Sequence, residues 1–595
     1  MRNEGSGMKD SAAAGNLRKL FLFFIFNSSL FVSVSGQAVV FSHPGGFYAD
    51  TFSLSMHIDF APQGAEGYAI HYTLDGGEPT ECATRYEAPL PLSAACYSQS
   101  EAYKVKTVPD DRWFAPDSVE RIIVVRAAAF DSNGYRCSPV TTHSYLIDSL
   151  LGRRISLPVV SVCADSLSLF DHDTGLFVPG WYHDPHYAYS TGNYFQKGRH
   201  WEREAAMGYY APDGTALEQD CGLRAHGNSQ RVLVQKGMSL YARNDYGERS
   251  FDYPFFGDRG RRNYRRLVLR PWSTSWSGAG VEDWLCQHLA DSLRFDHLST
   301  RPVVLFLNGE YWGIYFLEEK ADEHYLEARH GVEADSVDLL AYWGSEVENG
   351  AAERWEHFYR WLEREGSDFG YIAAQVDTGA VMDYMLMQIL ILNDDWPVSN
   401  VRQWAAPQGR WRWIFFDADG ALSSFPDNAA ILDYMTYKAS GTGSHTSHRS
   451  TLLFRRLFAD RQFLERSMAR LREVVDTRFS YSRSGALLRD IVAQVESEVP
   501  YQIRRFDKPS SMVKWRLSVS LIDDYLRTEP EAMVNEYAQY FGLEVPRDGS
   551  FAAYDRVGRQ VLPAGSREVQ MQALPKGVYF LRMDGGEIKK KEIKD

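Results

Sequence analysis

The chain has 595 residues, of which 44% are hydrophobic and 14% aromatic, and its formal net charge is −14. This length exceeds what one hydrophobic core can organise, so the sequence predicts several domains. The acidic balance is unfavourable for contact with nucleic acid or with an anionic membrane surface, and we expect neither as a partner.

The first 36 residues are typical of a secretory signal peptide. Arg18 and Lys19 precede the apolar run LFLFFIFNSSLFVSV, and small residues stand at Val34 and Gly36. The run is too short and too polar for a spanning helix, and no later segment reaches the ~20 apolar residues that such a helix needs. We therefore expect an exported mature chain without a transmembrane segment.

Short β-type runs alternate with turns from residue 37 to residue 148. Their spacing predicts a small β-sandwich. The segments FSHPGGFY, IHYTLDGGEPT and VVRAAAF resemble the immunoglobulin-like domain at the C-terminus of chitobiases. That resemblance favours a packing or spacer module, and contact of its aromatic residues with a glycan is the alternative. Cys82 and Cys96 allow a disulfide bridge, with free thiols as the alternative.

Four carboxylates lie close together between residues 393 and 422. Asp394 and Asp395 follow a long apolar run, and Asp417 and Asp419 end the strand-like segment WRWIFF. Together with the amide of Asn400, these oxygen ligands predict a Mg²⁺ site. Asp395 and Asn400 also have the D-x-x-x-x-N spacing of a protein-kinase catalytic loop. The alternative is that the carboxylates only cap turns.

A polar turn, HGNSQR, lies between two predicted strands. Asn228 and Arg231 offer hydrogen-bond donors in this turn, and Lys236 stands in the return strand on the same face as Met238 and Leu240. A buried lysine is costly unless it is paired, and the alternative is a side chain that extends to the edge of the sheet. Neither a P-loop nor a kinase G-x-G-x-x-G motif is present, so a phosphate site here would have another design.

The segment RPVVLFLNGEYWGIYFLEE predicts a β-hairpin that turns at Asn308 and Gly309. We expect a helix to follow directly, with Glu318 and Glu319 in its first turns, where the helix dipole favours acidic residues. The functional alternative is that Glu319 pairs with Lys236, as a helix glutamate pairs with a strand lysine in protein kinases.

Several motifs, in order, resemble the spore-coat protein H (CotH) kinase family: HGNS with QKGMSLYAR, EDWLCQHL, FLNGEYWGIYFLEEKADEHYL, NDDWPVSN and WRWIFFDAD. The resemblance implies a divergent protein-kinase-like α+β domain over residues 149–545. It also implies transfer of phosphate from ATP, with Mg²⁺ or Mn²⁺, to Ser or Thr of exported proteins.

The resemblance assigns roles by position. It implies that Asp395 acts on the acceptor hydroxyl. It implies that Lys236 contacts the phosphates of ATP and that Glu319 pairs with Lys236. Arg231 and Asn228 are expected at the nucleotide as donors of the polar turn. The residues that it brings to the metal are Asn400, Asp417 and Asp419. The chain departs from the usual family pattern at Ser399, where Asn is frequent, and at Gly420, where an aromatic residue is common.

Apolar residues recur at helical spacing between residues 451 and 543, which predicts a helical C-lobe. Residues 546–595 return to strand patterns, and YDRVGRQV, LPKGVYFLR and KKKEIKD resemble the sorting domain of the bacterial type IX secretion system. The expected fold is thus multidomain α+β: an immunoglobulin-like sandwich, a kinase-like domain and a short C-terminal β segment. This resemblance implies an exported or outer-membrane surface protein.

Two other functions remain alternatives to the kinase. One is a catalytically inactive kinase fold that serves as a surface adhesin or scaffold. The other is a glycoside hydrolase in which Asp395 and Asp417 are paired carboxylates, with Trp396 and Trp404 as sugar-stacking platforms.

Overall fold

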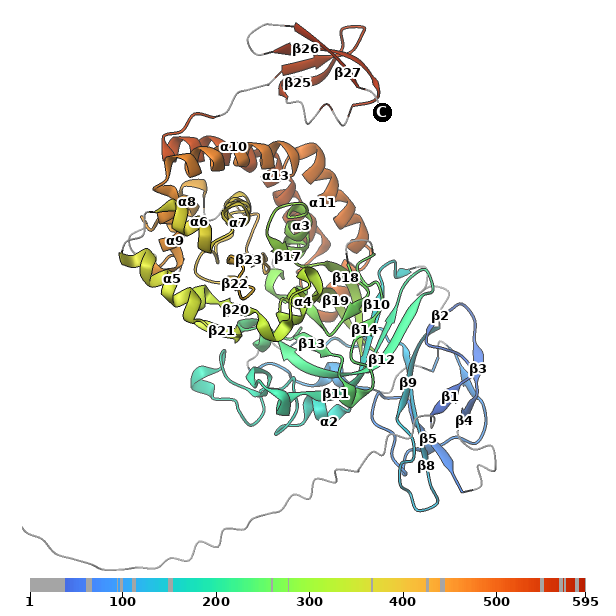
Figure 1. Cartoon of the computed structure of the whole chain (residues 1–595). Helices are drawn as coiled ribbons and strands as arrows, with labels where there is room; N and C mark the ends of the chain where they lie inside the picture. The colour runs from blue at the N-terminus through green and yellow to red at the C-terminus, as the bar shows by residue number, and fades with distance from the viewer. Residues whose placement is uncertain are drawn as a thin grey trace, which may run out of the picture.

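The computed structural model describes residues 38–59, 67–93, 95–96, 100–109, 114–147, 154–257, 260–276, 278–364, 368–423, 427–438, 445–545, 551–566, 571, 574–583 and 588–593. The predicted signal peptide lies outside these residues. Within them, no helix is long and apolar enough to cross a membrane. Figure 1 shows a β-rich N-terminal part, a central barrel, a helical region and a C-terminal sheet, so the expected α+β character is confirmed.

The N-terminal part consists of strands that close over one core. The strands are β1 (Val39–Phe41), β2 (Gly46–Tyr48), β3 (Phe52–Leu54), β4 (Met56–Ile58), β5 (Ala69–Thr73), β6 (Thr84–Arg85), β7 (Leu90–Leu92), β8 (Ile123–Phe130) and β9 (Thr141–Ile147). A five-stranded sheet, β2-β9-β8-β5-β6, is joined by the pairs β1-β4 and β3-β7. Cys82 and Cys96 are free thiols, as are the other four cysteines, so the bridge is not formed.

Strand β8 is buried on both faces because the barrel covers its second side. Val125 and Ala127 enter the core of the N-terminal part, whereas Val124 packs against Cys163 and Ala206 of the barrel. The backbone N–H of Ile122 also donates to the carbonyl of Gly309 at 2.9 Å. The N-terminal part is therefore fastened to the barrel by backbone hydrogen bonds as well as by apolar packing.

The barrel is closed in the strand order β10-β11-β12-β13-β16-β19-β18. Its strands are β10 (Val159–Cys163), β11 (Arg203–Tyr210), β12 (Ala216–His226), β13 (Gly237–Tyr241), β16 (Arg266–Pro271), β18 (Thr300–Leu307) and β19 (Glu310–Glu319), and the short elements beside it are α2 (Ser166–Phe170), β14 (Phe251–Asp252) and β15 (Asn263–Tyr264). Alternate residues fill its interior, among them Met238, Leu240, Leu267, Leu269 and Leu317. The residues between them point outward, as the two-residue period of a strand requires.

The hairpin predicted at Asn308 and Gly309 is confirmed, with φ of 49° and 80° at the two turn residues, in the left-handed region. The prediction that a helix begins directly after the hairpin, at Glu318 and Glu319, is wrong. Glu318 and Glu319 are the last two residues of β19, and the helix α4 (Glu323–His330) begins after its N-cap Asp322. Asp322 accepts hydrogen bonds from the first turn and so fixes this start.

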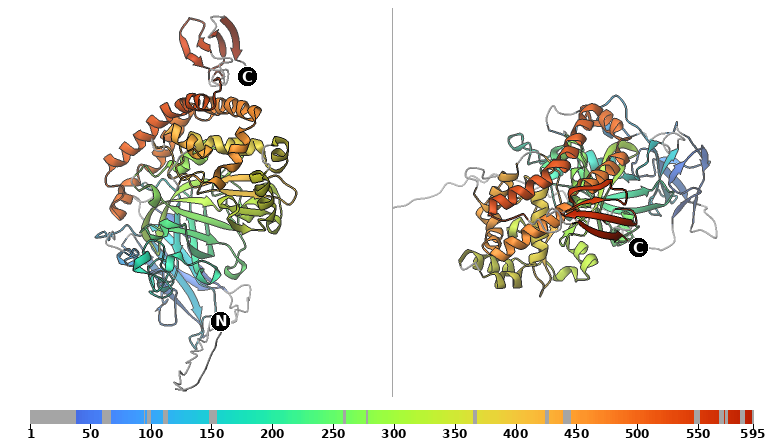
Figure 2. Two further views of the ribbon diagram at one scale, coloured as in Figure 1. Left: turned by 90° about the vertical axis from the view of Figure 1, so that its left-hand side faces the viewer. Right: turned by 90° about the horizontal axis from the view of Figure 1, so that it is seen from above.

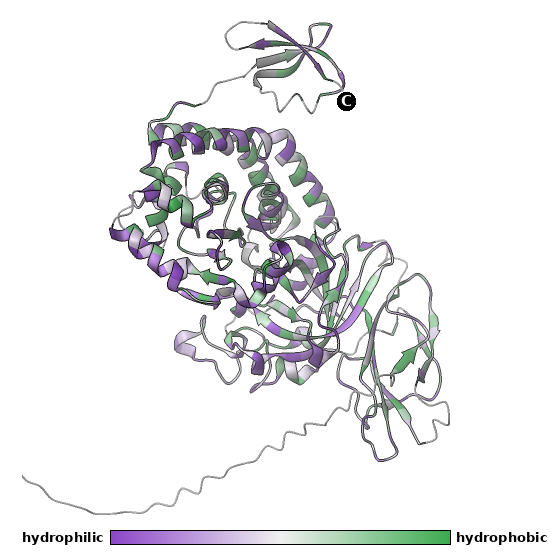
Figure 3. Ribbon diagram, viewed as in Figure 1, coloured by the Kyte–Doolittle hydropathy of each residue, from purple (hydrophilic) through white to green (hydrophobic). Residues whose placement is uncertain are grey.

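The helical region surrounds a second five-stranded sheet, in the order β17-β23-β22-β20-β21. These strands are β17 (Asp296–His297), β20 (Asp338–Ala341), β21 (Glu346–Asn349), β22 (Arg402–Ala405) and β23 (Arg412–Phe415). The helices are α3 (Glu282–Leu289), α5 (Glu353–Arg364), α6 (Phe369–Gln375), α7 (Thr378–Leu390), α8 (Asn428–Thr436), α9 (His448–Phe458), α10 (Arg461–Thr477), α11 (Tyr481–Val495), α12 (Val499–Phe506) and α13 (Met512–Phe541). The predicted helical C-lobe is thus confirmed, and Figure 3 shows apolar and polar bands alternating along α11 and α13.

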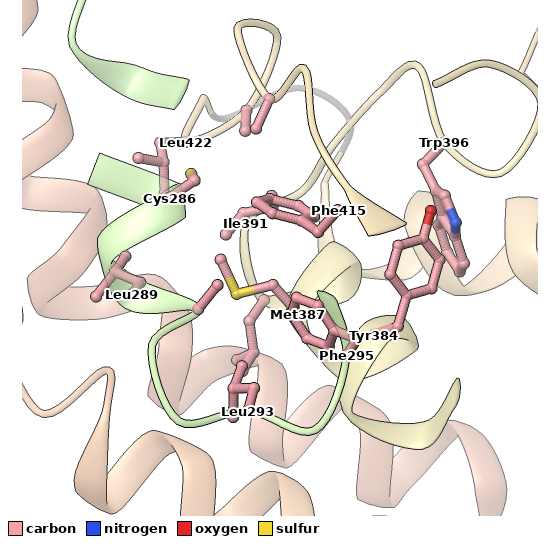
Figure 4. Packing of buried hydrophobic residues seen from close by; sticks show 14 of the residues in the cluster. Cys286, Leu289, Leu293, Phe295, Tyr384, Met387, Ile391, Trp396, Phe415 and Leu422 are labelled. Carbon is pink, nitrogen blue, oxygen red and sulfur yellow. The ribbon is translucent and has the colours of Figure 1, made fainter. Parts of the chain in front are cut away.

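Helix α7 forms the centre of the helical region and is buried along most of its length. Figure 4 shows its Tyr384 and Met387 beside Phe295, Phe415 and Trp396. The Tyr384 ring lies 5.8 Å from the Phe295 ring and 6.4 Å from the Trp396 ring, centroid to centroid. This apolar core lies directly beneath the loops that carry the carboxylates.

The C-terminal sheet has the order β25-β24-β26-β27. Its strands are β24 (Phe551–Tyr554), β25 (Gln560–Ser566), β26 (Gly577–Met583) and β27 (Ile588–Ile593). Figure 2 shows this sheet beyond the helical region, at the end of the molecule opposite the N-terminal strands.

Candidate functional site

Buried tryptophan and amide side chains hold the first acidic loop, which follows α7. The indole of Trp396 is fully buried, and its ring lies 5.1 Å from that of Phe454. The amide of Asn393, also fully buried, donates to Gln388 at 2.8 Å and accepts from the backbone N–H of Asp395 at 3.3 Å. The carboxylate of Asp395 therefore stands between two fixed residues at the edge of the core.

Asn400 joins the two acidic loops. Its amide Nδ2 donates to Oδ2 of Asp395 at 3.2 Å and to the backbone carbonyl of Asp417 at 3.3 Å. Asn400 and Asp417 have φ of 55° and 62°, a left-handed conformation that costs energy in most side chains but that Asn and Asp tolerate well. The structure thus brings Asp395, Asn400 and Asp417 together, as the sequence predicted.

Asp283, from α3, positions the second acidic loop. Its carboxylate Oδ1 accepts from the backbone N–H of Ala418 at 2.8 Å and from Nε2 of Gln287 at 3.3 Å. Ala418 stands between Asp417 and Asp419, so this bond sets the orientation of both carboxylates. Asp283 lies in the EDWLCQHL motif, but an acidic residue at the start of a helix is explained by the helix dipole alone, so the sequence predicted no role for it.

Arg270 faces the second acidic loop from the barrel. Its Nη2 contacts a carboxylate oxygen of Asp417 and lies 2.6 Å from Oδ2 of Asp419. Because Leu267 and Leu269 of β16 point into the barrel, Arg270 points outward. No sequence motif marks it, since it lies 147 residues before Asp417 in the chain.

Further cations lie at the end of β12. Burial, followed by the charges of Lys320, Arg231, Arg270 and Arg402, holds the pKa of His226 well below its usual range. The imidazole Nδ1 of His226 lies 2.9 Å from Oγ of Ser239. Lys320, Arg231 and Arg270 of the barrel and its turns, and Arg402 of β22, thus all lie near enough to His226 to act on its charge.

Burial raises the pKa of both carboxylates in the first loop. For Asp394 burial is the main cause, and for Asp395 the negative charges of Asp394 and Asp417 add to it. Gly420 lets Asp394 approach, because a Cβ at position 420 would lie 2.5 Å from Oδ1 of Asp394. A carboxylate with a raised pKa is a stronger base than an exposed one.

Lys236 and Glu319 do not form the predicted pair. The ammonium of Lys236 donates to the backbone carbonyls of Arg231 and Leu233 at 2.8 and 2.9 Å, and it lies 4.2 Å from the centre of the Tyr194 ring. Lys236 shares the barrel-facing side of its strand with Met238 and Leu240, so it points away from the carboxylates. Burial accordingly holds its pKa well below the usual range. The alternative of a side chain extending to solvent is also wrong, because Lys236 is 1% exposed.

Glu319 makes contacts within the barrel instead of pairing with Lys236. Its carboxylate accepts from the backbone N–H of Ser299 at 3.0 Å and lies 3.6 Å from Nε of Arg261. The preceding residue, Glu318, points to the site: burial raises its pKa far above the usual range, and the charge of Arg270 opposes that shift. Because the segment is a strand, Glu319 faces the barrel with Leu317, and Glu318 faces outward, toward Arg270.

Two residues of the turn HGNSQR, Arg231 and Asn228, were predicted to contact the nucleotide, and their surroundings differ. Arg231 donates to the carbonyl of Gly227 at 2.7 Å and to that of Tyr194 at 2.8 Å, which fastens the turn to a neighbouring segment. Asn228 is exposed at the tip of the turn. The role of Asn228 at a nucleotide remains a prediction, whereas the Arg231 side chain is engaged with backbone carbonyls.

Comparison with protein families decides the identity of this domain. The family model described as CotH kinase protein matches residues 223–533, just over half of the chain. The chain belongs to the CotH kinase family. A second model, described as Fn3 associated, matches residues 62–145 of the N-terminal part. The resemblance of this part to the chitobiase-type domain stays a prediction. A search of curated proteins found no match.

The oxygen atoms at the site of the CotH domain are of the type that binds a hard divalent cation. Asp395, Asn400, Asp417 and Asp419 offer carboxylate and amide oxygens only, which are the ligands that Mg²⁺ prefers. In the described part of the chain, no three His, Cys, Asp or Glu side chains converge closely enough to hold a metal by themselves. The Mg²⁺ site therefore stays a prediction.

The glycoside hydrolase alternative is not supported in the CotH domain. Trp396 is fully buried and Trp404 is 4% exposed, so neither ring is available for stacking on a sugar. The indole N–H of Trp404 donates to Asp296 at 2.8 Å, which is a structural contact beneath the sheet.

Proposed function

We propose that this chain is an exported atypical protein kinase that transfers the γ-phosphoryl group of ATP to Ser or Thr of an exported protein. The observation that carries the proposal is the amide of Asn400, which links the Asp395 loop to the Asp417 loop opposite the cations of the barrel. Phosphoryl transfer requires both kinds of group: oxygen ligands that hold a metal, and cations that bind the phosphates.

Asp395 is the proposed general base. Asn400 holds one of its oxygens, which leaves the other for the hydroxyl of the acceptor. The hydroxyl proton passes to Asp395 while the hydroxyl oxygen bonds to the γ-phosphorus, and the bond from that phosphorus to the bridging oxygen of ADP breaks. The raised pKa of Asp395, caused by burial and by Asp394 and Asp417, favours this transfer.

Asn400, Asp417 and Asp419 are the residues that would hold Mg²⁺ or Mn²⁺. When bound, the ion neutralises charge on the transferring phosphate oxygens. Asp283 supports these residues through its hydrogen bond to Ala418, since a displaced loop would move both carboxylates.

Arg270 and Lys320 replace Lys236 as the proposed phosphate-binding cations. Lys320 follows β19 directly, and its ammonium lies 3.2 Å from the hydroxyl of Tyr241. Arg270 and Val268 lie on the outer face of β16, so the guanidinium of Arg270 faces away from the barrel interior. Asn228 is a further candidate donor to the nucleotide from the exposed turn.

The test compares carboxylate-to-amide variants at three positions. Asp417→Asn removes metal-dependent nucleotide binding, since a neutral amide holds a divalent cation far less well than a carboxylate. Asp395→Asn retains binding but lowers turnover by orders of magnitude, because the residue acts only in the reaction step. Asp173→Asn, in an exposed turn, is the matched control and changes neither.

Calorimetric titration with ATP and Mg²⁺ or Mn²⁺ measures binding, and transfer of radiolabel to a mixture of exported proteins measures turnover. No nucleotide binding with either metal would refute the kinase proposal. Binding without transfer to varied acceptors would favour the second candidate, an inactive scaffold. The observation in favour of that candidate is the absence of the lysine–glutamate pair, because Lys236 binds carbonyls instead.

We further propose that the chain is exported in two steps, by its N-terminal signal and by the C-terminal strands. The support is the signal pattern in residues 1–36 and the segment GVYFLR, which forms most of β26. Deletion of residues 550–595 should retain the protein in the periplasm, as measured by immunoblotting of cell fractions. Unchanged levels at the surface or in the medium would contradict this route.

A further inference from the structure

Arg270 occupies the two carboxylates that the proposed function assigns to a divalent cation. One nitrogen, Nη2, contacts both Asp417 and Asp419, with 2.6 Å to Oδ2 of Asp419. The three side chains are mostly buried, with exposed fractions of 14%, 24% and 16% for Arg270, Asp417 and Asp419. Ion pairs in such surroundings are much less screened than those at a surface.

The backbone of Arg270 is fixed on both sides. Strand β16 lies between β13 and β19 in the closed barrel, with Leu269 paired to Met238 and to Leu317. The guanidinium, at the end of a flexible side chain, can move without any change in the barrel. It can therefore turn between neighbouring anions while its own strand stays in place.

The charges around Arg270 favour a tightly held cation. Burial lowers its pKa, but Asp417, Asp419, Asp283 and Glu318 outweigh that effect, and its pKa is raised well above the usual value. Removing the guanidinium would leave several buried carboxylates without their closest cation. Such a cluster either takes up protons or binds another cation.

We propose that Arg270 is an exchangeable counter-ion that makes metal binding depend on the nucleotide. Without nucleotide, Arg270 holds Asp417 and Asp419 and competes with a divalent cation for them. With nucleotide, Arg270 passes to the phosphate oxygens, and the two carboxylates accept the metal. This inference rests on the proposed function, because it takes the nucleotide and the metal from it.

A charge count gives the reason for the coupling. Asp417, Asp419 and Arg270 together carry one net negative charge, and a divalent cation entering alone meets the guanidinium at close range. Phosphate oxygens of the nucleotide supply the missing anionic partners of Arg270. Nucleotide and metal should therefore strengthen each other's binding, as linkage requires.

The test is the affinity for Mn²⁺ alone, measured by calorimetry and by the electron paramagnetic resonance signal of the free ion. The Arg270→Met variant should bind Mn²⁺ without nucleotide about 10- to 100-fold more tightly than the wild type, the range for lost charge-assisted bonds. Its affinity for a non-hydrolysable ATP analogue with Mn²⁺ should fall by a similar factor. Arg270→Lys should lie between the two, since it keeps the charge but not the guanidinium geometry.

Arg266→Met is the matched control. Arg266 stands on the same strand and carries the same charge, but it pairs with Asp322 and Glu323, each at 2.9 Å. This variant should leave the affinity for Mn²⁺ alone unchanged within about twofold, as expected for a charge outside the site. If Arg270→Met does not fold, Arg270→Lys and Arg270→Gln give the same comparison.

The outcomes separate this inference from the proposed function. An unchanged or weaker affinity of the Arg270 variants for Mn²⁺ alone would overturn the exchange, even if the wild type binds nucleotide. Failure of the wild type to bind nucleotide with any metal would refute the kinase proposal. In that case, tighter Mn²⁺ binding by Arg270→Met would still show that Arg270 competes with the metal, while removing the nucleotide-dependent half of the inference.

Discussion

Asp283 gives a direct measure of how far the acidic loop depends on support from α3. In Asp283→Ala, the backbone N–H of Ala418 and Nε2 of Gln287 lose their shared acceptor. Ala418 is fully buried and Gln287 is 2% exposed, so water does not replace the lost bonds. Each unsatisfied donor costs about 1–3 kcal/mol, so two of them should lower the free energy of unfolding by about 2–6 kcal/mol.

Asp283→Asn separates the hydrogen bond from the charge. Its amide oxygen still accepts from Ala418, so the loss of stability should stay below about 1.5 kcal/mol, the typical value for one hydrogen bond. Urea unfolding followed by tryptophan fluorescence measures both variants, and titration with ATP and Mn²⁺ measures the site. We expect nucleotide affinity to fall at least about tenfold in Asp283→Ala. A stability within about 0.5 kcal/mol of the wild type, the level of an ordinary surface change, would refute the reasoning.

Three further changes test other parts of the molecule. Burial raises the pKa of Glu282 from the usual range of a glutamate to about 7, so the stability that it contributes when protonated is lost as the pH rises through about 7. Glu282→Gln should remove this pH dependence, a difference of about 3 kcal/mol between pH 5 and pH 8 in urea unfolding. Lys236→Met leaves two carbonyls unsatisfied, so it should cost about 2–6 kcal/mol in the free energy of unfolding, but nucleotide affinity should stay within a few-fold of the wild type. A collapse of nucleotide affinity in a folded variant would show that Lys236 belongs to the site. Gly420→Ala should destabilise by about 0.5–1.5 kcal/mol, because the Asp394 carboxylate has to turn off its rotamer to avoid the new Cβ. This cost should vanish in the Asp394→Ala background, and equal costs in both backgrounds would contradict the clash.

The local part of the site could be predicted from the sequence. Asp395 and Asn400 are five residues apart, and Asp417 ends the next buried strand, so short-range geometry alone brings them close. The hairpin at Asn308 and Gly309 was predictable for the same reason, because its turn conformation is a property of two adjacent residues.

The cationic half of the site could not be predicted in this way. Arg270 meets Asp417 and Asp419 only because the closed barrel places β16 opposite a loop of the helical region. The lysine–glutamate pair of protein kinases predicted Lys236 as a site residue. However, the apolar residues Met238 and Leu240 share its side of the strand, which indicates that Lys236 faces the barrel interior. The alternation of apolar residues, applied strictly, would have excluded Lys236 and selected Arg270 and Glu318.

The division of charge between the two parts of the domain has a physical consequence. The barrel supplies Arg270 and Lys320, and the helical region supplies Asp395, Asn400 and Asp417, so neither part alone forms a complete site. The contact of Arg270 with Asp417 and Asp419 spans the junction, beside an apolar core that residues of both parts share. Nucleotide phosphates bound between the two parts would replace the contact of Arg270 with Asp417 and Asp419. The phosphates would contact the barrel cations directly and the carboxylates through a metal. Nucleotide binding should therefore change the contact between the barrel and the second acidic loop, and Arg270 is the residue through which that change acts.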